Sequence, residues 1–387
     1  VPIGSFQFDS LPNSSYIIGA SSRMTFYPSN YNTIYLGRNN LLLKATNNGQ
    51  TFETIYDFGE EVMAVEIAWT DPDVMYVTTY PDWWGDKKIW RSSDAGVSWT
   101  NITPSTTLLG GDAWVPYDIA VSSDNENVLW AARTSQYGGG YPNLDGSQVY
   151  KTTDGGNTWG NITTSDLDGE SITNIVHQRG TSGGIYIGTR RAVYYKNDNT
   201  GWELFNNNLP LSTPSTKMVP FYKGGMIRNA TSRSVYECEF YETAPLQAQI
   251  SSDKNKVSCY DTLVYFVDNS ALSSDNPTWQ WSFPGGNPSS STDQNPVVSY
   301  SSPGFYDVSL TVSDDYGIST QSYTAFINYN DEVVSLDVQE DFEQGFNSDW
   351  RLENANNSYN WSLIDIPNGP DCVPTKCAFV DHYSINQ

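Results

Sequence analysis

Residues 92–99, Ser-Ser-Asp-Ala-Gly-Val-Ser-Trp, are the stretch that decides the fold, because the chain repeats their pattern. Residues 152–159, Thr-Thr-Asp-Gly-Gly-Asn-Thr-Trp, share the order S/T-x-D-x-G-x-x-W. Residues 45–52 are a weaker copy, with Asn for Asp and Phe for Trp, and residues 196–202 are an eroded fourth copy. Each copy follows two short β-branched and aromatic runs, so the repeating unit is a small antiparallel sheet with a tight turn.

Each turn combines three residue types with separate physical roles. The Asp carboxylate can accept backbone N–H groups within the turn, and the Gly permits a positive φ. The closing aromatic side chain is expected to pack between adjacent sheets. We therefore interpret the motif as structural, with a catalytic role for its Asp residues as the alternative. The residues assigned to it are Asp94, Gly96, Trp99, Asp154, Gly156 and Trp159.

The repeat resembles the Asp-box (bacterial neuraminidase) repeat of sialidase-like, xyloglucanase-like and sortilin-like β-propellers. The resemblance implies propeller blades over residues 1–243, with each box on an outer turn of its blade. Four to five blades can be counted in this sequence, whereas most such propellers have about six to eight. We therefore expect a partial propeller whose other blades lie upstream of Val1, an unusually small propeller being the alternative.

A second pattern follows in residues 246–330. It includes Trp-Gln-Trp-Ser-Phe-Pro-Gly-Gly at 279–286 and Pro-Gly-Phe-Tyr-Asp-Val-Ser-Leu-Thr-Val at 303–312, whose alternation predicts a half-buried strand. These motifs resemble a PKD (polycystic kidney disease) domain. The resemblance implies an immunoglobulin-like β-sandwich in which Trp279 or Trp281 is the core tryptophan. Domains of this family act as spacers and adhesive modules.

The C-terminal residues form a third unit in this interpretation. Glu-Asp-Phe-Glu at 340–343 and Cys-Ala-Phe-Val at 377–380 resemble the start of a jelly-roll module found in cargo proteins of bacterial type IX secretion. The resemblance implies that residues 335–387 hold an incomplete jelly-roll. It also implies export by the type IX secretion machinery, to the extracellular space or the outer cell surface. Such modules often bind Ca²⁺, so Glu343 and Asp381 are candidate calcium ligands, and no other cofactor is expected.

Charge and cysteine content limit the partners and the compartment. The chain of 387 residues has 20 Lys and Arg against 44 Asp and Glu, a formal charge of −24. Such a surface repels phosphate backbones, so we expect no nucleic-acid partner. Apolar runs are too short for a membrane-spanning segment. The four cysteines suggest two disulfides in an oxidising compartment, Cys238 with Cys259 and Cys372 with Cys377, or else free thiols.

Three aromatic, Gly-rich insertions between blade strands are the candidate ligand-binding site. They carry Trp83 and Trp84, Trp114, and Tyr137 and Tyr141. Exposed aromatic rings stack on sugar rings or on partner proteins. The alternative is that these rings pack between blades.

No constellation of catalytic residues is visible, and we assign none. The carboxylates are numerous but unpaired in sequence, and acid–base catalysis needs groups with separated pKa values. The expected function is therefore a non-catalytic, secreted or cell-surface protein with an adhesive or scaffolding role that binds a glycan or a protein. The alternative is an ancillary part of a secreted glycoside hydrolase or peptidase whose catalytic residues lie upstream.

Overall fold

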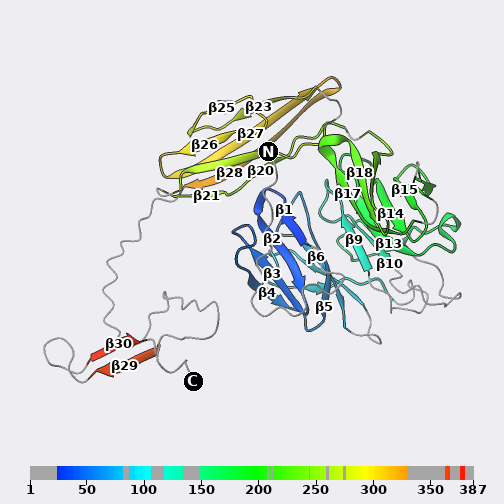
Figure 1. Cartoon of the computed structure of the whole chain (residues 1–387), viewed down its shortest axis with the longest axis horizontal. Helices are drawn as coiled ribbons and strands as arrows, with labels where there is room; N and C mark the ends of the chain where they lie inside the picture. Colours follow the sequence, from blue (N-terminus) through cyan, green and yellow to red (C-terminus); the bar gives the residue numbers. More distant parts are fainter. Residues whose placement is uncertain are drawn as a thin grey trace. The chain divides into compact units, whose positions relative to one another are not determined.

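The computed structural model shows an all-β protein, as predicted (Figure 1). Apart from strands, the described residues contain two short 3₁₀ turns, Ser165–Leu167 and Tyr222–Gly224. No helix in the described part of the chain is long and apolar enough to cross a membrane. One compact unit spans Ile18–Asp331, and a separate unit holds the C-terminal strands. The structure describes residues 24–81, 87–105, 117–133, 148–206, 209–210, 213–243, 245–258, 261–272, 276–329, 362–366 and 375–379.

Five antiparallel meanders follow one another along the chain, and we call them blades 1 to 5. Blade 1 consists of β1 (Met24–Tyr27), β2 (Asn30–Arg38), β3 (Leu41–Ala45) and β4 (Glu53–Asp57). Blade 2 consists of β5 (Glu61–Ile67), β6 (Met75–Tyr80), β7 (Lys88–Ser92) and β8 (Thr100–Asn101). Blade 3 consists of β9 (Tyr117–Val121), β10 (Leu129–Arg133), β11 (Val149–Thr152) and β12 (Gly160–Asn161). Blade 4 consists of β13 (Ile172–His177), β14 (Ile185–Thr189), β15 (Val193–Lys196) and β16 (Glu203–Leu204). Blade 5 consists of β17 (Ser215–Phe221), β18 (Met226–Thr231) and β19 (Val235–Glu239).

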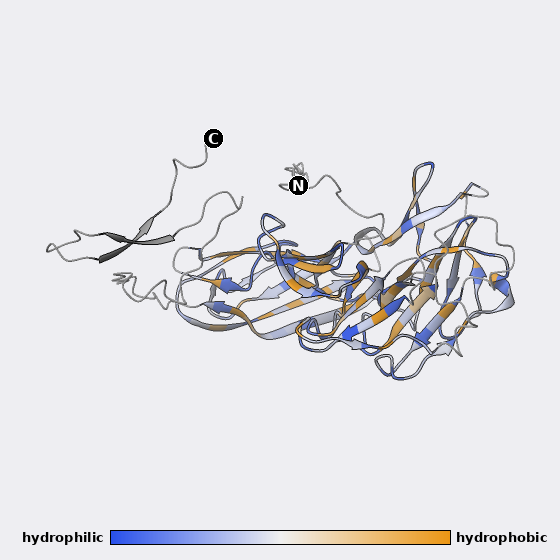
Figure 2. Cartoon of the chain, turned by 90° about the horizontal axis from the view of Figure 1, so that it is seen from below, coloured by the Kyte–Doolittle hydropathy of each residue, from blue (hydrophilic) through white to orange (hydrophobic). Residues whose placement is uncertain are grey.

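Apolar layers between consecutive blades form the core of this region. Strands β5, β9, β13 and β17, the first strands of blades 2 to 5, lie next to one another. Figure 2 shows the apolar residues concentrated on the strands. The closing tryptophans of the repeats belong to these layers: Trp99 packs between blades 1 and 2, Trp159 between blades 2 and 3, and Trp202 between blades 3 and 4. Trp202 is almost fully buried, whereas Trp99 and Trp159 are half-buried.

A two-sheet sandwich follows the blades. Its buried core contains Trp281, which is fully buried and stacks on Phe283 with ring centroids 5.6 Å apart, while Trp279 is half-buried at the edge of the core. One sheet has the order β24 (Gly286–Asn287), β26 (Val297–Tyr300), β22 (Leu263–Asp268) and β20 (Ile250–Ser252). The other has the order β21 (Lys256–Val257), β28 (Gly317–Tyr329), β27 (Gly304–Asp314), β23 (Thr278–Ser282) and β25 (Ser290–Ser291).

Two strands represent the C-terminal unit. Strands β29 (Ser362–Ile366) and β30 (Thr375–Phe379) form an antiparallel pair in which Ile364 lies opposite Cys377. The other residues of the expected jelly-roll start, including Glu343, Cys372 and Asp381, lie outside the described residues.

Candidate functional site

In each blade we use the word edge for the side at which strands begin and end. The two edges differ because an antiparallel meander reverses direction at every turn. One edge, the box edge, carries the turns from first to second strand and from third to fourth strand. The opposite edge, the insertion edge, carries the turns from second to third strand and the connections to the next blade. The strand registers place Glu61 opposite Tyr80 and Tyr117 opposite Arg133 at this insertion edge.

All three aromatic insertions leave from the insertion edge. Residues 82–86 connect β6 to β7, residues 106–116 connect β8 to β9, and residues 134–147 connect β10 to β11. The first and third are second-to-third strand turns, and the middle one is a blade-to-blade connection. The five aromatic residues predicted to bind ligand lie outside the described residues, namely Trp83, Trp84, Trp114, Tyr137 and Tyr141.

Buried charged residues lie at the strand ends from which the insertions leave. Lys87 is fully buried, and its Nζ lies 3.8 Å from the ring centroid of Tyr80. Arg133 and Asp118 are also buried. The Asp118 carboxylate accepts the backbone N–H of Ile175 in the next blade at 2.8 Å. The hydrogen bond from Ile175 to Asp118 therefore links the first strands of blades 3 and 4, and the Tyr80 ring partly compensates for the burial of the Lys87 charge.

A polar cluster with an aromatic ring lies beside the first insertion. The Lys88 ammonium forms an ion pair with Glu60, and the Thr79 hydroxyl donates to the same carboxylate at 2.7 Å. The Trp90 indole donates its Nε1–H to the Thr79 oxygen at 3.0 Å and is half-buried. Sequence analysis missed this cluster because its members come from three separate strands or turns. The only available signal was that charged residues flank each insertion.

The repeat turns lie on the box edge and use their carboxylates internally. The Asp94 carboxylate accepts the Ser98 backbone N–H at 2.9 Å and hydroxyl hydrogen bonds from Ser92 and Ser98. Asp154 makes the same set with Thr152 and Thr158. These hydrogen bonds, with the side-chain hydroxyl at position 98 or 158 the largest cause, lower the pKa of each carboxyl to about 2.

The geometry of the box turns needs glycine. Gly96 and Gly156 have φ values of +91° and +95°, in the left-handed region. A Cβ at Gly156 would also lie 2.6 Å from Ile102 of the preceding blade. The indole Nε1–H of Trp159 donates to the carbonyl of that same Ile102 at 2.7 Å. The turn at 152–159 therefore joins blade 3 to blade 2 by a hydrogen bond. The Trp99 indole instead donates to Gly96 of its own turn, and its ring packs on Tyr56 and Phe58.

The sandwich contacts the blades at the box edge. Its β20 pairs with β2 at Ser252 and Asn30. Gln247 of the sandwich donates to Asp124, in the turn between β9 and β10. Arg179, in the turn after β13, donates from Nη2 to the carbonyl of Asn269 at 2.9 Å. These contacts place the sandwich at the edge opposite to the strand ends from which the aromatic insertions leave.

Arg179 is the most buried cation at this junction. Its guanidinium lies between two rings, with its Cζ 4.5 Å from the Trp69 centroid and 4.0 Å from the Tyr222 centroid. The side chain is 6% exposed, and Nε and Nη1 have no hydrogen-bond partner among the described residues. The ring faces therefore supply much of the compensation for removing this charge from water.

His177, two residues before Arg179, is a buried neutral histidine. Its ring stacks on Trp130 with centroids 5.0 Å apart, and its Nδ1–H donates to the Gly184 carbonyl at 2.8 Å. Burial lowers the pKa of His177 to about 4, although the hydrogen bond to Gly184 favours the protonated form.

Acid is therefore expected to destabilise the blades through His177. The unfolded chain binds this proton near pH 6.5, and the folded chain binds it only near pH 4. The stabilisation is complete at pH 7, and about 3 kcal/mol is lost as the pH falls from 6.5 to 4. Urea unfolding at pH 7.0, 5.5 and 4.5 measures the loss. The His177→Gln variant keeps every carboxylate of the wild type but lacks the titrating imidazole. Its free energy of unfolding should therefore change less with pH than that of the wild type. Equal slopes would contradict the assignment.

The cysteines and metal ligands can be placed only in part. Cys238 is a free, half-buried thiol, which does not support the expected pair with Cys259, a residue outside the described part. Among the described residues, no group of three or more His, Cys, Asp and Glu could hold a metal ion.

Comparison with known proteins concerns the sandwich first. Residues 243–328 match the family model of the PKD domain. The match covers the two-sheet sandwich, so the PKD domain predicted from the sequence is confirmed. No curated protein sequence matches the chain.

Solved structures resemble the larger part of the chain at low identity. A GH74 enzyme from Niastella koreensis is 15% identical, with a TM-score of 0.37 over 77% of this chain and 55% of that one. The GH74 xyloglucanase from Xanthomonas campestris is 10% identical, with a TM-score of 0.43 over 77% and 57%. YCF48 from Cyanidioschyzon merolae is 14% identical, with a TM-score of 0.38 over 73% and 99%. The chain spans little more than half the length of these two GH74 proteins.

Proposed function

We propose that this chain is a non-catalytic binding protein of the cell exterior, with an adhesive or scaffolding role and a glycan as its ligand. The observation that carries the proposal is the common edge of the three aromatic insertions. The insertions leave from one edge of blades 2 and 3, and the contacts of the PKD domain are made at the other edge. The aromatic sequence of the three insertions, together with their common edge, supports a ligand-binding role for this edge.

The polar cluster beside the first insertion fits sugar recognition. Glycan sites combine an aromatic face with polar groups that orient the hydroxyls, as ligand sites do in general. Glu60 and Lys88, which are both partly exposed, supply polar groups in the described part of this edge. Thr79 is buried and donates to Glu60, and Trp90 packs against Phe58, so these two residues support the pair from behind the surface. Trp83, Trp84, Trp114, Tyr137 and Tyr141 would supply the stacking faces.

The box residues have a structural role in this proposal. Both oxygens of Asp94 and of Asp154 accept hydrogen bonds from their own turns, which supports a role in turn formation. A carboxyl with a pKa near 2 is a poor general acid at neutral pH. In this proposal Asp94 and Asp154 stabilise their own turns and are not catalytic residues.

Export through type IX secretion completes the proposal. A PKD domain after propeller blades is an arrangement suited to presenting a binding face away from an anchor. The extracellular space or the outer surface is the proposed location, with Glu343 and Asp381 as candidate calcium ligands in the C-terminal unit. Fractionation of the native cells, with the protein found in the cytosol, would contradict the location.

The alternative is that the chain is the ancillary part of a secreted glycoside hydrolase or peptidase. We retain this alternative because GH74 enzymes are among the similar structures. Incubation of the chain with xyloglucans, sialosides and peptides distinguishes the two. Turnover that a single Asp or Glu substitution abolishes would replace the binding proposal with an enzymatic one.

Loss of the insertion aromatics is expected to abolish glycan binding. In a glycan array and titration with the full chain, the double variant Trp83→Ala/Trp84→Ala should bind about tenfold more weakly or worse, because stacking faces are lost. Tyr316→Ala removes a 79% exposed ring from the PKD domain and is the matched control, with unchanged affinity expected. Equal binding by both variants, or no glycan bound by wild type, would contradict the proposal.

A further inference from the structure

Blade 5 differs from blades 2, 3 and 4 in its outermost strand. In those blades a short fourth strand pairs with the third strand, whereas β19 is the edge strand of blade 5 among the described residues. Its Val235 is 65% exposed. Within the described part of the chain, the outer edge of β19 is therefore unpaired, and such an edge is the kind of surface to which another strand can add.

The fourth strands of blades 2 and 3 share one sequence and one set of contacts. Residues 99–103 and 159–163 both have the order W-x-N-I-T. In blade 3 the Ile162 N–H donates to the Val149 carbonyl at 2.9 Å, and the Thr163 hydroxyl oxygen accepts the Val149 N–H at 2.9 Å. Blade 2 repeats both contacts at Ile89. The W-x-N-I-T motif is therefore a strand that bonds to both the backbone N–H and the backbone carbonyl of one residue of the third strand.

The strand registers identify the equivalent positions in blade 5. Each blade has a row of residues that face one another across its strands, and the third member of each row is aromatic. In blade 2 the row is Val65, Val77, Trp90 and Asn101, and in blade 3 it is Ile119, Ala131, Tyr150 and Asn161. In blade 4 it is Ile175, Ile187, Tyr194 and Leu204, and in blade 5 it is Met218, Asn229 and Tyr236. Tyr236 therefore stands where the other blades receive their fourth strand, and Val235 corresponds to Val149.

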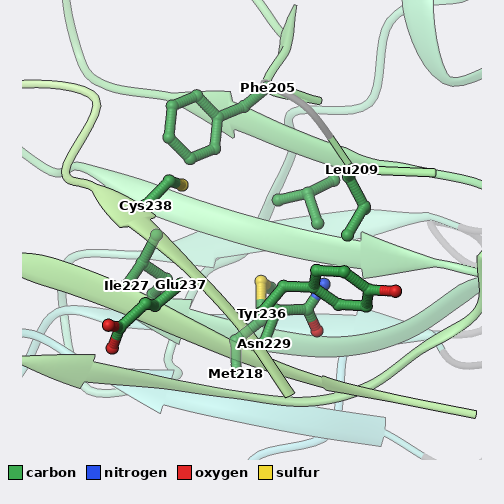
Figure 3. Close-up of a pocket in the computed structure, with 9 residues that line it drawn as sticks. Phe205, Leu209, Met218, Ile227, Asn229, Tyr236, Glu237 and Cys238 are labelled. Carbon is green, nitrogen blue, oxygen red and sulfur yellow. The ribbon is translucent and has the colours of Figure 1, made fainter. Parts of the chain in front are cut away.

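A cavity lies between blades 4 and 5, in the position that corresponds to the one that the tryptophan of the W-x-N-I-T motif occupies between blades 2 and 3. Trp159 packs against Ile102 of the preceding blade. The residue of blade 4 that is equivalent to Ile102 is Phe205. The Phe205 N–H donates to the Val193 carbonyl, just as the Ile102 N–H donates to the Ile89 carbonyl. Phe205 and Val193 line a cavity of about 110 Å³ between blades 4 and 5. Figure 3 shows Cys238, Met218 and Ile227 among the side chains that surround it.

We propose that the free edge of β19 and this cavity bind an extended segment of another polypeptide with the pattern W-x-N-I-T. Its Trp would enter the cavity beside Phe205, and its Ile and Thr would pair with the backbone of Val235. In this chain the five-residue pattern occurs only at 99–103 and 159–163, and both copies already serve their own blades. The exposed Glu237 and Glu239 on β19 favour a segment with basic or neutral flanks.

A peptide of the chain's own sequence tests the proposal. Fluorescein-labelled Asn157–Thr164, titrated with the full chain by fluorescence anisotropy, should bind saturably. The same peptide with Trp159→Ala should bind about tenfold more weakly, because the anchoring ring is lost. Val235→Pro removes the outward N–H and should also weaken binding about tenfold, whereas Val235→Ala keeps that N–H and should bind like wild type.

Alkylation of Cys238 gives a second measurement that needs no variant. The thiol lies in the cavity, so the peptide should slow its reaction with iodoacetamide, followed site by site by mass spectrometry, and the Trp159→Ala peptide should not. Absence of binding, equal binding of the two peptides, or unprotected Cys238 would overturn the proposal. A dimer of the chain that Val235→Pro dissociates would also overturn it, because the edge would then belong to a second copy.

Discussion

Replacing Trp281 by alanine is expected to lower the free energy of unfolding of the PKD domain by about 3–5 kcal/mol. Trp281 is fully buried, stacks on Phe283 and donates its indole N–H to the Asp293 carbonyl at 3.0 Å. The substitution leaves a large cavity in the middle of the sandwich and an unpaired carbonyl. Urea unfolding followed by tryptophan-independent far-UV circular dichroism measures the loss.

Trp279→Ala is the matched control for this prediction. Trp279 is two residues away on the same face of the same strand, but it is half-buried and bonds to the Asp268 carboxylate at the edge of the core. We expect it to cost less than half as much as Trp281→Ala, because less apolar area is returned to water. Equal losses in the two variants would show that the core is centred elsewhere.

Replacing Arg179 by alanine is expected to uncouple the PKD domain from the blades and to cost about 3 kcal/mol of stability. The guanidinium lies between Trp69 and Tyr222 and donates to Asn269, so its removal leaves a gap between two rings and an unpaired carbonyl. Differential scanning calorimetry should then resolve two transitions for the variant, whereas a single transition is expected for the wild type.

Arg228→Ala is the control for the Arg179 prediction. Arg228 also lies over a ring, with its Cζ 3.8 Å from the Phe221 centroid, and it forms an ion pair with Glu237 at 3.1 Å. Both partners of that pair are about half exposed, and exposed pairs contribute about 1 kcal/mol or less. If Arg228→Ala separated the transitions as strongly as Arg179→Ala, the junction would not depend on the buried cation.

The closing aromatics of the repeat show how far spacing alone can be interpreted. Sequence analysis expected Trp99 and Trp159 to pack between sheets, and both lie in inter-blade layers. It did not distinguish their half-burial from the near-complete burial of Trp202 in the eroded copy. How deeply a ring is buried depends on the side chains that the preceding blade presents, and those lie tens of residues away in the sequence.

The proposed binding site was accessible to sequence analysis only as three separate aromatic insertions. Their common edge follows from strand order, since two connect second to third strands and one connects consecutive blades. The buried charges at their bases carried no local signal. Lys87 and Arg133 are ordinary surface residue types, and only the packing of neighbouring strands around them removes them from water.

The sequence by itself determined the all-β class, the turn chemistry of the repeats and the PKD domain, because these depend on neighbours a few residues apart. A carboxylate two to four residues from its donors, or a glycine with positive φ, acts within one turn. Only the tertiary structure decided which of Trp279 and Trp281 is the core residue, where Arg179 is buried and that β19 is an edge strand among the described strands. Each of these depends on surfaces brought together from distant parts of the chain, whose burial no local pattern encodes.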